Sequence, residues 1–217
     1  MKKQLSAALF TSLLIASPFA SANFSVNVGA ISVDPDNSSS AINEAPTLGL
    51  KGGADTQLGV TIDYAFNDKW VLELVTATPF DHNVNGTGGL AGNKIADIKQ
   101  LPPTLFAQYH FFDNSDAFRP FVGVGVNYTV FFDEQPTDAL KATLGTDDVE
   151  VKLDNSFGFA AQAGFNYMMN ESWGLHAMVS VIDIETDATV YADGAQALTS
   201  TVKIDPVVAM LGVKYAF

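Results

Sequence analysis

Apolar side chains recur at every second position in eight segments of this 217-residue chain. A period of two is typical of β-strands that present one apolar face. Strands of about ten residues are long enough to cross a bilayer in a tilted barrel. The eight segments are 24–30, 58–66, 70–74, 105–111, 122–130, 157–167, 173–181 and 207–217.

A soluble β-sandwich shows the same alternation, so the two folds are distinguished by the lengths of the connections between the segments. Connections 34–56, 79–104, 133–156 and 185–201 are long, whereas those at 67–68, 113–117 and 170–172 are tight. Outer-membrane barrels have long loops outside the cell and short turns in the periplasm. The alternation of long and short connections therefore favours a membrane barrel.

Aromatic residues gather beside the tight turns, as expected for the girdle at one membrane interface. They are Tyr64, Phe66, Trp70, Tyr109, Phe111, Tyr167, Trp173 and Tyr215. The chain ends on Phe217, and this last strand, with Tyr215 and Phe217, resembles the signal that the outer-membrane barrel assembly machinery recognises. The sequence thus predicts an all-β fold, an eight-stranded antiparallel transmembrane up-and-down β-barrel that is a monomer.

The N-terminus has the three parts of a secretory signal peptide. Lys2 and Lys3 precede an apolar stretch at 5–19, and small residues at 20–22 end in Ala22. A membrane-anchoring helix needs about 20 apolar residues, and this stretch is shorter and contains Pro18. We expect residues 1–22 to be removed and residues 23–217 to form the barrel in the outer membrane of a Gram-negative cell.

Charge and composition exclude several functions. The sequence carries a net charge of −13, which disfavours nucleic acid because phosphates would be repelled. It contains no cysteine, so thiol chemistry is excluded. The long connections hold 16 of the 24 acidic residues. The acidic clusters at 34–37 and 147–148 lack the spacing of a calcium loop, so no metal or other cofactor is predicted.

If the apolar faces contact lipid, the opposite faces line the lumen, because successive side chains alternate along a strand. Ionisable residues of the inward set fall toward the periplasmic end and predict a polar plug of Asp63, Glu73, His110, His176 and Lys214. The outer half of the lumen is predicted to be an apolar cup lined by Val75, Ala77, Phe106, Phe131, Met178, Ser180, Ile182, Val208 and Met210. Glycines on the same faces make room between these side chains.

A hydrophobic molecule in such a cup would not cross the charged plug readily, and sideways exit into the bilayer is the alternative. Pro79, Pro102 and Pro103 lie where the third and fourth strands meet their long connection, and proline lacks the N–H that a strand ladder needs. They are the candidate lateral opening. The simpler interpretation is that these prolines only end the strands.

Two other classes of function have to be compared with transport. An enzyme would need a nucleophile and a base, and His176 and Ser180 share the inner face. Four residues of extended chain span about 13 Å, which is too far for a direct hydrogen bond, so no enzyme is predicted. A structural or adhesive barrel would use its acidic loops as a receptor for phage, bacteriocin or a host surface, or to contact lipopolysaccharide and outer-membrane lipid.

Several stretches resemble the outer membrane protein W (OmpW) family. They include TQLGVTIDYAFNDKWVLELVTATPFDH at 56–82, LPPTLFAQYHF at 101–111, FRPFVGVGVNYTVFFD at 118–133 and KIDPVVAMLGVKYAF at 203–217. The resemblance implies an eight-stranded porin-like channel with a narrow, largely hydrophobic interior that passes small hydrophobic molecules. It also implies a receptor role for the loops in some hosts, although the first loop lacks the family's recognisable strings.

Overall fold

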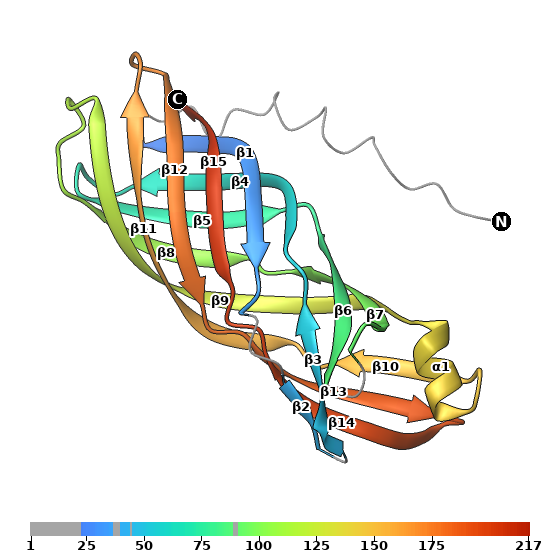
Figure 1. Cartoon of the computed structure of the whole chain (residues 1–217). Helices are drawn as coiled ribbons and strands as arrows, with labels where there is room; N and C mark the ends of the chain where they lie inside the picture. The colour runs from blue at the N-terminus through green and yellow to red at the C-terminus, as the bar shows by residue number, and fades with distance from the viewer. Residues whose placement is uncertain (1–22, 37–39, 44, 89–90) are drawn as a thin grey trace.

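Eight antiparallel strands close into a barrel in the computed structural model, which describes residues 23–36, 40–43, 45–88 and 91–217 (Figure 1). They follow one another around the wall in chain order, and β9 pairs with β11 while β15 pairs with β1. The predicted fold is confirmed. The strands are β1 (Phe24–Asp34), β4 (Asp55–Ala65), β5 (Trp70–Ala77), β8 (Thr104–His110), β9 (Phe118–Pro136), β11 (Ser156–Met168), β12 (Trp173–Ile182) and β15 (Val207–Ala216).

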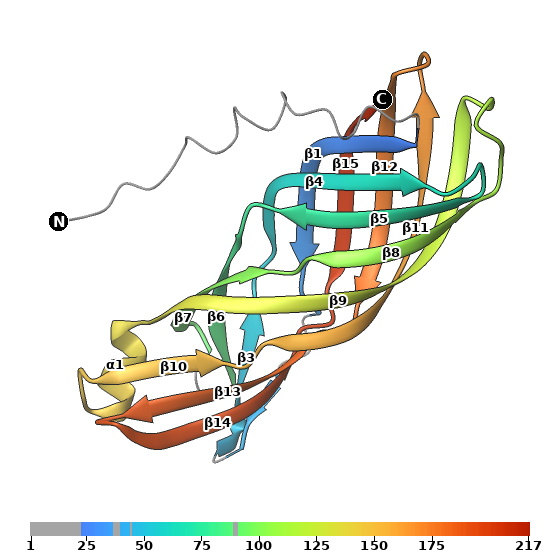
Figure 2. The same ribbon diagram turned by 180° about the vertical axis from the view of Figure 1, so that it is seen from behind.

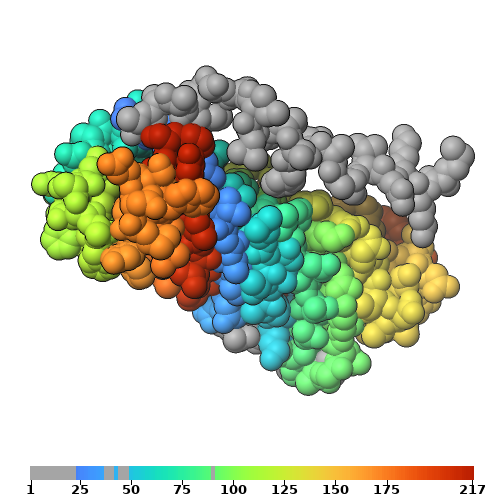
Figure 3. All heavy atoms as spheres, turned by 90° about the horizontal axis from the view of Figure 1, so that it is seen from above, coloured from blue at the N-terminus to red at the C-terminus, as the bar shows by residue number. Residues whose placement is uncertain are grey.

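Closure of the barrel depends on the last strand lying beside the first. Figure 3 shows β15, in red, directly against β1, in blue. The register runs from Ser25 opposite Ala216 to Asp34 opposite Val207. Beyond the strand, the Phe217 N–H donates to the Phe24 carbonyl at 3.1 Å. The predicted signal peptide and its cleavage after Ala22 lie outside the described residues.

The two faces of the wall are inverted relative to a water-soluble protein. Phe159 is 70% exposed on the outer face, whereas Thr61 on the inner face is fully buried. Large apolar side chains in water would form a patch far beyond that of ordinary soluble monomers. In a bilayer they contact lipid, and the closed sheet satisfies its own backbone hydrogen bonds. Among the described residues, no helix has the length and hydrophobicity to cross a membrane.

Aromatic rings pair across neighbouring strands beside the tight turns. Trp70 meets Tyr109 with ring centroids 5.3 Å apart, and Trp173 meets Tyr215 at 4.8 Å. Both contacts are edge-on, a geometry that suits the quadrupoles of the rings. These exposed pairs form a belt at the end of the barrel that carries the short turns, which is the expected place for an interfacial girdle.

The four long connections, whose conformation the sequence leaves open, are regular. They form further strands and one helix beyond the barrel, at the end opposite the short turns (Figures 1 and 2). In the described residues these are β2 (Ser40–Ile42), β3 (Ala45–Gly52), β6 (Phe80–Gly88), β7 (Lys94–Leu101), α1 (Asp138–Leu144), β10 (Val149–Leu153), β13 (Glu185–Ala192) and β14 (Ala195–Lys203).

This outer extension consists of two sheets. Strand β9 continues past the barrel wall and pairs with β7, which leads through β6 and β3 to β2. Strands β10, β13 and β14 form a separate sheet. Pairing satisfies backbone groups that an irregular loop would leave to water, and it buries side chains such as Thr186 and Ala188 on one face. These advantages explain why the long connections form sheets.

Candidate binding cavity in the barrel lumen

The periplasmic half of the lumen is polar, and its first cluster surrounds an ion pair. Lys214 Nζ on β15 lies 2.5 Å from Asp63 Oδ2 on β4. Strand β1 lies between them and supplies Ser25 and Asn27, each of which donates a hydrogen bond to the same carboxylate oxygen. Lys214 also donates to Ser25 Oγ at 2.7 Å. The two charges are therefore paired and further satisfied by neutral groups, as buried charges require.

A second polar cluster is built around Glu73 on β5. Gln108 and Gln162 both donate to Glu73 Oε2, at 2.8 and 2.9 Å. His176 Nε2 lies 3.6 Å from Glu73 Oε1, and His176 Nδ1 contacts Asn166 Oδ1 at 2.9 Å. The five residues of the predicted plug thus fall into two networks, since His110 joins the second by donating to Gln108 Oε1. The glutamines and asparagines were not singled out from the sequence because they carry no charge.

An aromatic ring packs against the two histidines of the second polar cluster. Phe121 on β9 is stacked with His176 at 5.7 Å between centroids and lies 5.1 Å from His110. Gly164 provides the space for it, because a Cβ at that position would come within 2.6 Å of Phe121 Cζ. The alternation places Phe121 on the inner face, but the sequence gives no sign that its ring would cover both histidines.

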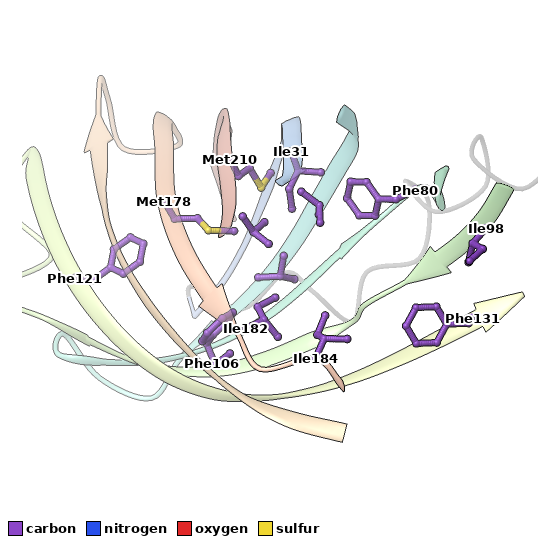
Figure 4. Packing of buried hydrophobic residues seen from close by; sticks show 14 of the residues in the cluster. Ile31, Phe80, Ile98, Phe106, Phe121, Phe131, Met178, Ile182, Ile184 and Met210 are labelled. Atoms are coloured by element: carbon purple, nitrogen blue, oxygen red, sulfur yellow. The ribbon is translucent and has the colours of Figure 1, made fainter. Parts of the chain in front are cut away.

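Toward the outer end of the barrel the lumen is apolar (Figure 4). Phe106 is 1% exposed and faces Gly125, where a Cβ would come within 2.7 Å of its ring. Of the residues predicted for this half, all are buried except Ala77, which packs against the others. Their cluster includes Val75, Phe131, Met178, Ile182, Val208 and Met210, and also Ile31, Val33, Phe80 and Ile184, which are not among the predicted residues. Ile31, Val33 and Ile184 share the inward parity of their strands, whereas Phe80 does not continue the parity of β5.

A small cavity lies in this apolar half, with a volume of about 20 Å³, which is room for about one water molecule. Most of its wall is hydrocarbon from β1, β5, β8, β12 and β15. Three lining residues carry hydroxyl groups, namely Thr76, Thr104 and Ser180. Thr104 donates to the Pro102 carbonyl and accepts from Asn127. The other residues that line the cavity are Ile31, Val33, Val75, Ala77, Phe80, Pro102, Phe106, Ile182 and Val208.

Beside this cavity the barrel wall is interrupted. The ladder between β5 and β8 ends with Val75 opposite Thr104, and the ladder between β6 and β7 begins with Phe80 opposite Gln100. Residues 76–79 and 101–103, all of them described, form no ladder pair with each other. Each side keeps its other neighbour, because the Thr78 N–H donates to the Leu58 carbonyl and the Tyr128 N–H donates to the Pro103 carbonyl.

The three prolines predicted to mark a weak point occupy this interruption. Pro102 lines the cavity, and the carbonyl of Pro103 accepts a hydrogen bond from β9. Pro79, on the other side of the interruption, is exposed. None of them has an N–H to donate across the interruption. Their placement therefore fits both interpretations that the sequence left open, an opening and a strand end.

A wider cavity lies in the outer extension, between the two sheets and α1. Its volume is about 100 Å³. The lining is almost entirely apolar, with Leu140 of α1 and Phe131 of β9 among its residues. His82 and Gln100 are the buried polar exceptions, and they satisfy each other at 2.9 Å while His82 Nδ1 donates to the Gly53 carbonyl. Phe131, Ala96 and Ile98 belong to the lumen cluster as well, so apolar surface is continuous from this cavity into the barrel.

The arrangement offers binding to apolar groups rather than acid–base chemistry. His176 is engaged with Asn166 and approaches Glu73, and no hydrogen bond joins it to Ser180 among the described residues. No group of three or more potential metal ligands is found in the described part of the chain. What the geometry provides is a hydrocarbon-lined space between a polar plug and an interrupted wall.

Proteins of known family are similar to this chain over nearly its whole length. The sequence model of the OmpW family matches residues 20–217. Outer membrane protein W of Vibrio cholerae serotype O1 is 42% identical over 198 residues, which cover 90% of this chain and 88% of that protein. Outer membrane protein W of Escherichia coli K12 is 40% identical over 224 residues and is matched over the full length of both chains.

A solved structure shows the same fold. The crystal structure of the outer membrane protein OprG from Pseudomonas aeruginosa superposes with a TM-score of 0.83 and 42% sequence identity. The match covers 91% of this chain and 96% of that chain. It extends over both the barrel and much of the outer extension, so the likeness includes the region around the cavity and not only the membrane wall.

Proposed function

Because this chain belongs to the OmpW family and is an outer-membrane β-barrel, we propose that it passes small hydrophobic molecules into the bilayer. The solute enters the cavity of the outer extension, moves into the apolar half of the lumen, and leaves sideways between β5 and β8. The barrel acts as a conduit from the aqueous exterior to the hydrocarbon of the membrane and not as an open pore.

The interruption beside the apolar cavity is the observation that carries this proposal. A closed β-barrel has no free edge, since each strand pairs on both sides. Here residues 76–79 and 101–103 lack pairing on one side only, and Ala77 and Pro102 line the cavity directly behind. A side opening at this position would connect a hydrocarbon-lined space with the hydrocarbon of the lipid, so a solute would not have to meet water again.

The polar plug makes passage to the periplasm unfavourable for such a solute. An apolar molecule moving into the plug would separate Gln108 and Gln162 from Glu73, and their buried polar atoms would then lose their partners. A lost buried hydrogen bond costs about 1–3 kcal/mol, and more for charged groups. The sideways path breaks no hydrogen bond of this kind.

Cross-linking across the interruption tests the exit. The chain has no cysteine, so Ala77→Cys with Pro102→Cys introduces the only two thiols. A short bifunctional thiol reagent should bridge them and abolish transfer of an apolar fluorophore into proteoliposomes, and a cleavable reagent should restore it. The matched control is Leu74→Cys with Leu105→Cys, which are direct partners inside the intact ladder. Equal transfer with and without the bridge at Ala77 and Pro102 would exclude lateral exit.

Charge in the apolar half tests the path before the exit. Val75→Arg and Phe106→Arg each place a cation among hydrocarbon side chains, which is costly for an apolar solute and for the barrel. Transfer of the fluorophore should fall strongly in both variants when only the fraction folded on a cold gel is compared. The control is Val124→Arg. Val124 is 68% exposed on the outer face of β9, so this variant adds a charge without changing the lumen. Normal transfer in both lumen variants would exclude the apolar path.

A further inference from the structure

Ser180 is a buried hydroxyl without a hydrogen-bond partner in the apolar half of the lumen. It is 2% exposed, lies between Met178 and Ile182 along β12, and lines the cavity beside the interrupted wall. No described residue accepts from or donates to its Oγ. Nearly all buried polar side-chain atoms in proteins have a partner, so an exception of this kind calls for an explanation.

A second unpartnered atom lies next to it. Gln162 on β11 is directly opposite Ser180 in the strand register and is 5% exposed. Its Nε2 donates to Glu73 Oε2, while its Oε1 has no partner among the described residues. Side chains that are directly opposite in an antiparallel pair have Cβ atoms about 4.5–5.5 Å apart. A single small group can therefore reach both atoms.

The two atoms mark the boundary between the halves of the lumen. Gln162 belongs to the polar plug through Glu73, and Ser180 belongs to the apolar cavity through its neighbours. A hydroxyl can donate and accept, whereas the side-chain amide oxygen of Gln162 can only accept. Together they present one acceptor and one group of either kind at the lower end of a space whose other walls are mainly hydrocarbon.

We propose that Ser180 and Gln162 bind the neutral polar end of an amphiphilic solute, a medium-chain alcohol being the simplest example, while its hydrocarbon chain extends from the small cavity among the apolar side chains of the outer half of the lumen. The alcohol oxygen accepts from Ser180 Oγ, and its proton is donated to Gln162 Oε1. This inference rests on the proposed function and narrows its substrates from hydrocarbons to neutral molecules with a terminal hydrogen-bonding group.

A charged end group fits this position poorly. A carboxylate would approach Glu73, which Gln162 already holds at 2.9 Å, and an ammonium group would leave its charge among apolar side chains. A water molecule at the same place would satisfy the two atoms and would fill the small cavity. An alcohol satisfies the same polar atoms and also removes its own hydrocarbon chain from water, a gain in free energy that a bound water molecule does not offer.

The test compares two solutes of equal chain length, 1-decanol and decane. The purified full-length barrel in nanodiscs is loaded with an apolar fluorophore, and each solute is titrated until the probe is displaced, with empty nanodiscs to correct for partition into lipid. The wild type should bind 1-decanol more tightly than decane. In Ser180→Ala the affinity for 1-decanol should fall by about 2- to 10-fold, which is the usual worth of one hydrogen bond, while decane binds as before.

Three further variants complete the test. Ser180→Thr keeps the hydroxyl and should retain the preference for the alcohol. Ser180→Cys keeps the size but offers only a weak hydrogen-bonding group, so it should behave like Ser180→Ala and serves if the alanine variant folds poorly. Ser156→Ala removes a buried hydroxyl that already accepts from the Glu185 N–H elsewhere on the barrel, and the preference should be unchanged.

The outcomes separate this inference from the function on which it rests. A wild-type barrel from which neither solute displaces the probe would contradict the proposed function itself. If both solutes displace it but Ser180→Ala changes their affinities equally or not at all, the site for a polar end group is excluded. That second result is also what an ordered water between Ser180 and Gln162 would give.

Discussion

Lys214 Nζ and Asp63 Oδ2 are 2.5 Å apart inside the barrel, although their strands are not neighbours. Strand β1 lies between β15 and β4, so the ion pair passes in front of it and joins the last strand of the chain to the second strand of the barrel. Ser25 and Asn27 of β1 bind the same carboxylate oxygen. One buried charge pair thus connects the three strands around the point where the barrel closes.

We predict that removing either charge alone destabilises the barrel strongly. Asp63→Asn leaves the buried ammonium group of Lys214 without its counterion, and Lys214→Met leaves the carboxylate of Asp63 unpaired. Breaking a buried pair in this way typically costs about 3–5 kcal/mol. The free energy of unfolding in urea, followed by tryptophan fluorescence in detergent micelles, measures the loss.

The double variant shows whether the two charges stabilise the barrel as a pair or independently. Asp63→Asn with Lys214→Met removes both charges and should be more stable than either single variant, because no buried charge remains unpaired. Lys69 and Asp113, whose ion pair lies at the exposed turns, provide the comparison, and removing it should change stability little. Additive losses in the double variant would show that the two charges do not act as a pair.

Asp55 connects the barrel to the outer extension beside the interrupted wall. Its Oδ2 accepts from the Asp81 N–H at 2.8 Å and from Gln57 Nε2 at 2.7 Å, and its Oδ1 accepts from the Thr56 N–H at 2.8 Å. Burial acts to raise the pKa of Asp55, but these hydrogen bonds outweigh it and hold the pKa below its ordinary value of 3.8. The charged form is therefore favoured in the folded protein.

The lowered pKa predicts the direction of a pH effect. Since the folded-state pKa lies below the unfolded one, the contribution of Asp55 is fully present above the ordinary value and is lost as the pH falls through the lowered pKa. The amide NMR signal of Asp81 should titrate with a midpoint below 3.8, and in Asp55→Asn this titration should disappear. A midpoint at or above the ordinary value would contradict the assignment.

The strands and their faces could be predicted from the sequence because side chains alternate between the two faces of a strand whatever its neighbours are. A shift by one residue would turn Asp63 and Glu73 to the lipid and Leu72 and Leu74 to the lumen, so only one assignment is physically tolerable. The plug could be located on the same grounds. Its division into two networks could not, because it depends on which strands lie opposite one another across the lumen.

The outer extension could not be predicted for a different reason. Segments such as 185–203 contain polar residues on both faces and turn residues at 193–194, which are equally typical of a loop. β13 and β14 form a local hairpin around this turn, but the third strand of their sheet is distant in the chain, with Val151 of β10 opposite Val190 of β13. The interruption at Pro102 was a candidate from the sequence, but its extent follows from a one-residue change of register between the two successive ladders.

Gly164 should be intolerant of any side chain. A Cβ there would lie 2.3 Å from the Ala177 carbonyl oxygen as well as within 2.6 Å of the Phe121 ring, and the backbone atom cannot move aside cheaply. Gly164→Ala should therefore lose about 1–3 kcal/mol of stability, the usual cost of overpacking. Gly53→Ala is the matched control, because its Cβ would meet nothing closer than 3.8 Å. Equal stability of the two variants would show that the barrel adjusts without cost.

Phe121 should limit the passage of ions through the plug. Its ring is 1% exposed and packs against His110 and His176. Phe121→Ala should leave a cavity next to polar groups that water can enter, with a loss of about 3–5 kcal/mol in stability. The wild-type barrel should carry very small currents in planar bilayers because the plug fills its lumen, and the variant should carry larger ones.

The control for this current is a phenylalanine of the same wall that faces lipid. Phe165 is 37% exposed on β11, next to the Gly164 that accommodates Phe121. Phe165→Ala removes an identical side chain without opening the lumen, so its current should equal that of the wild type. Because the hydrogen bonds around Glu73 and Asp63 persist in both variants, an increase confined to Phe121→Ala would assign the barrier to the ring. Unchanged current in Phe121→Ala would assign it to the two polar networks alone.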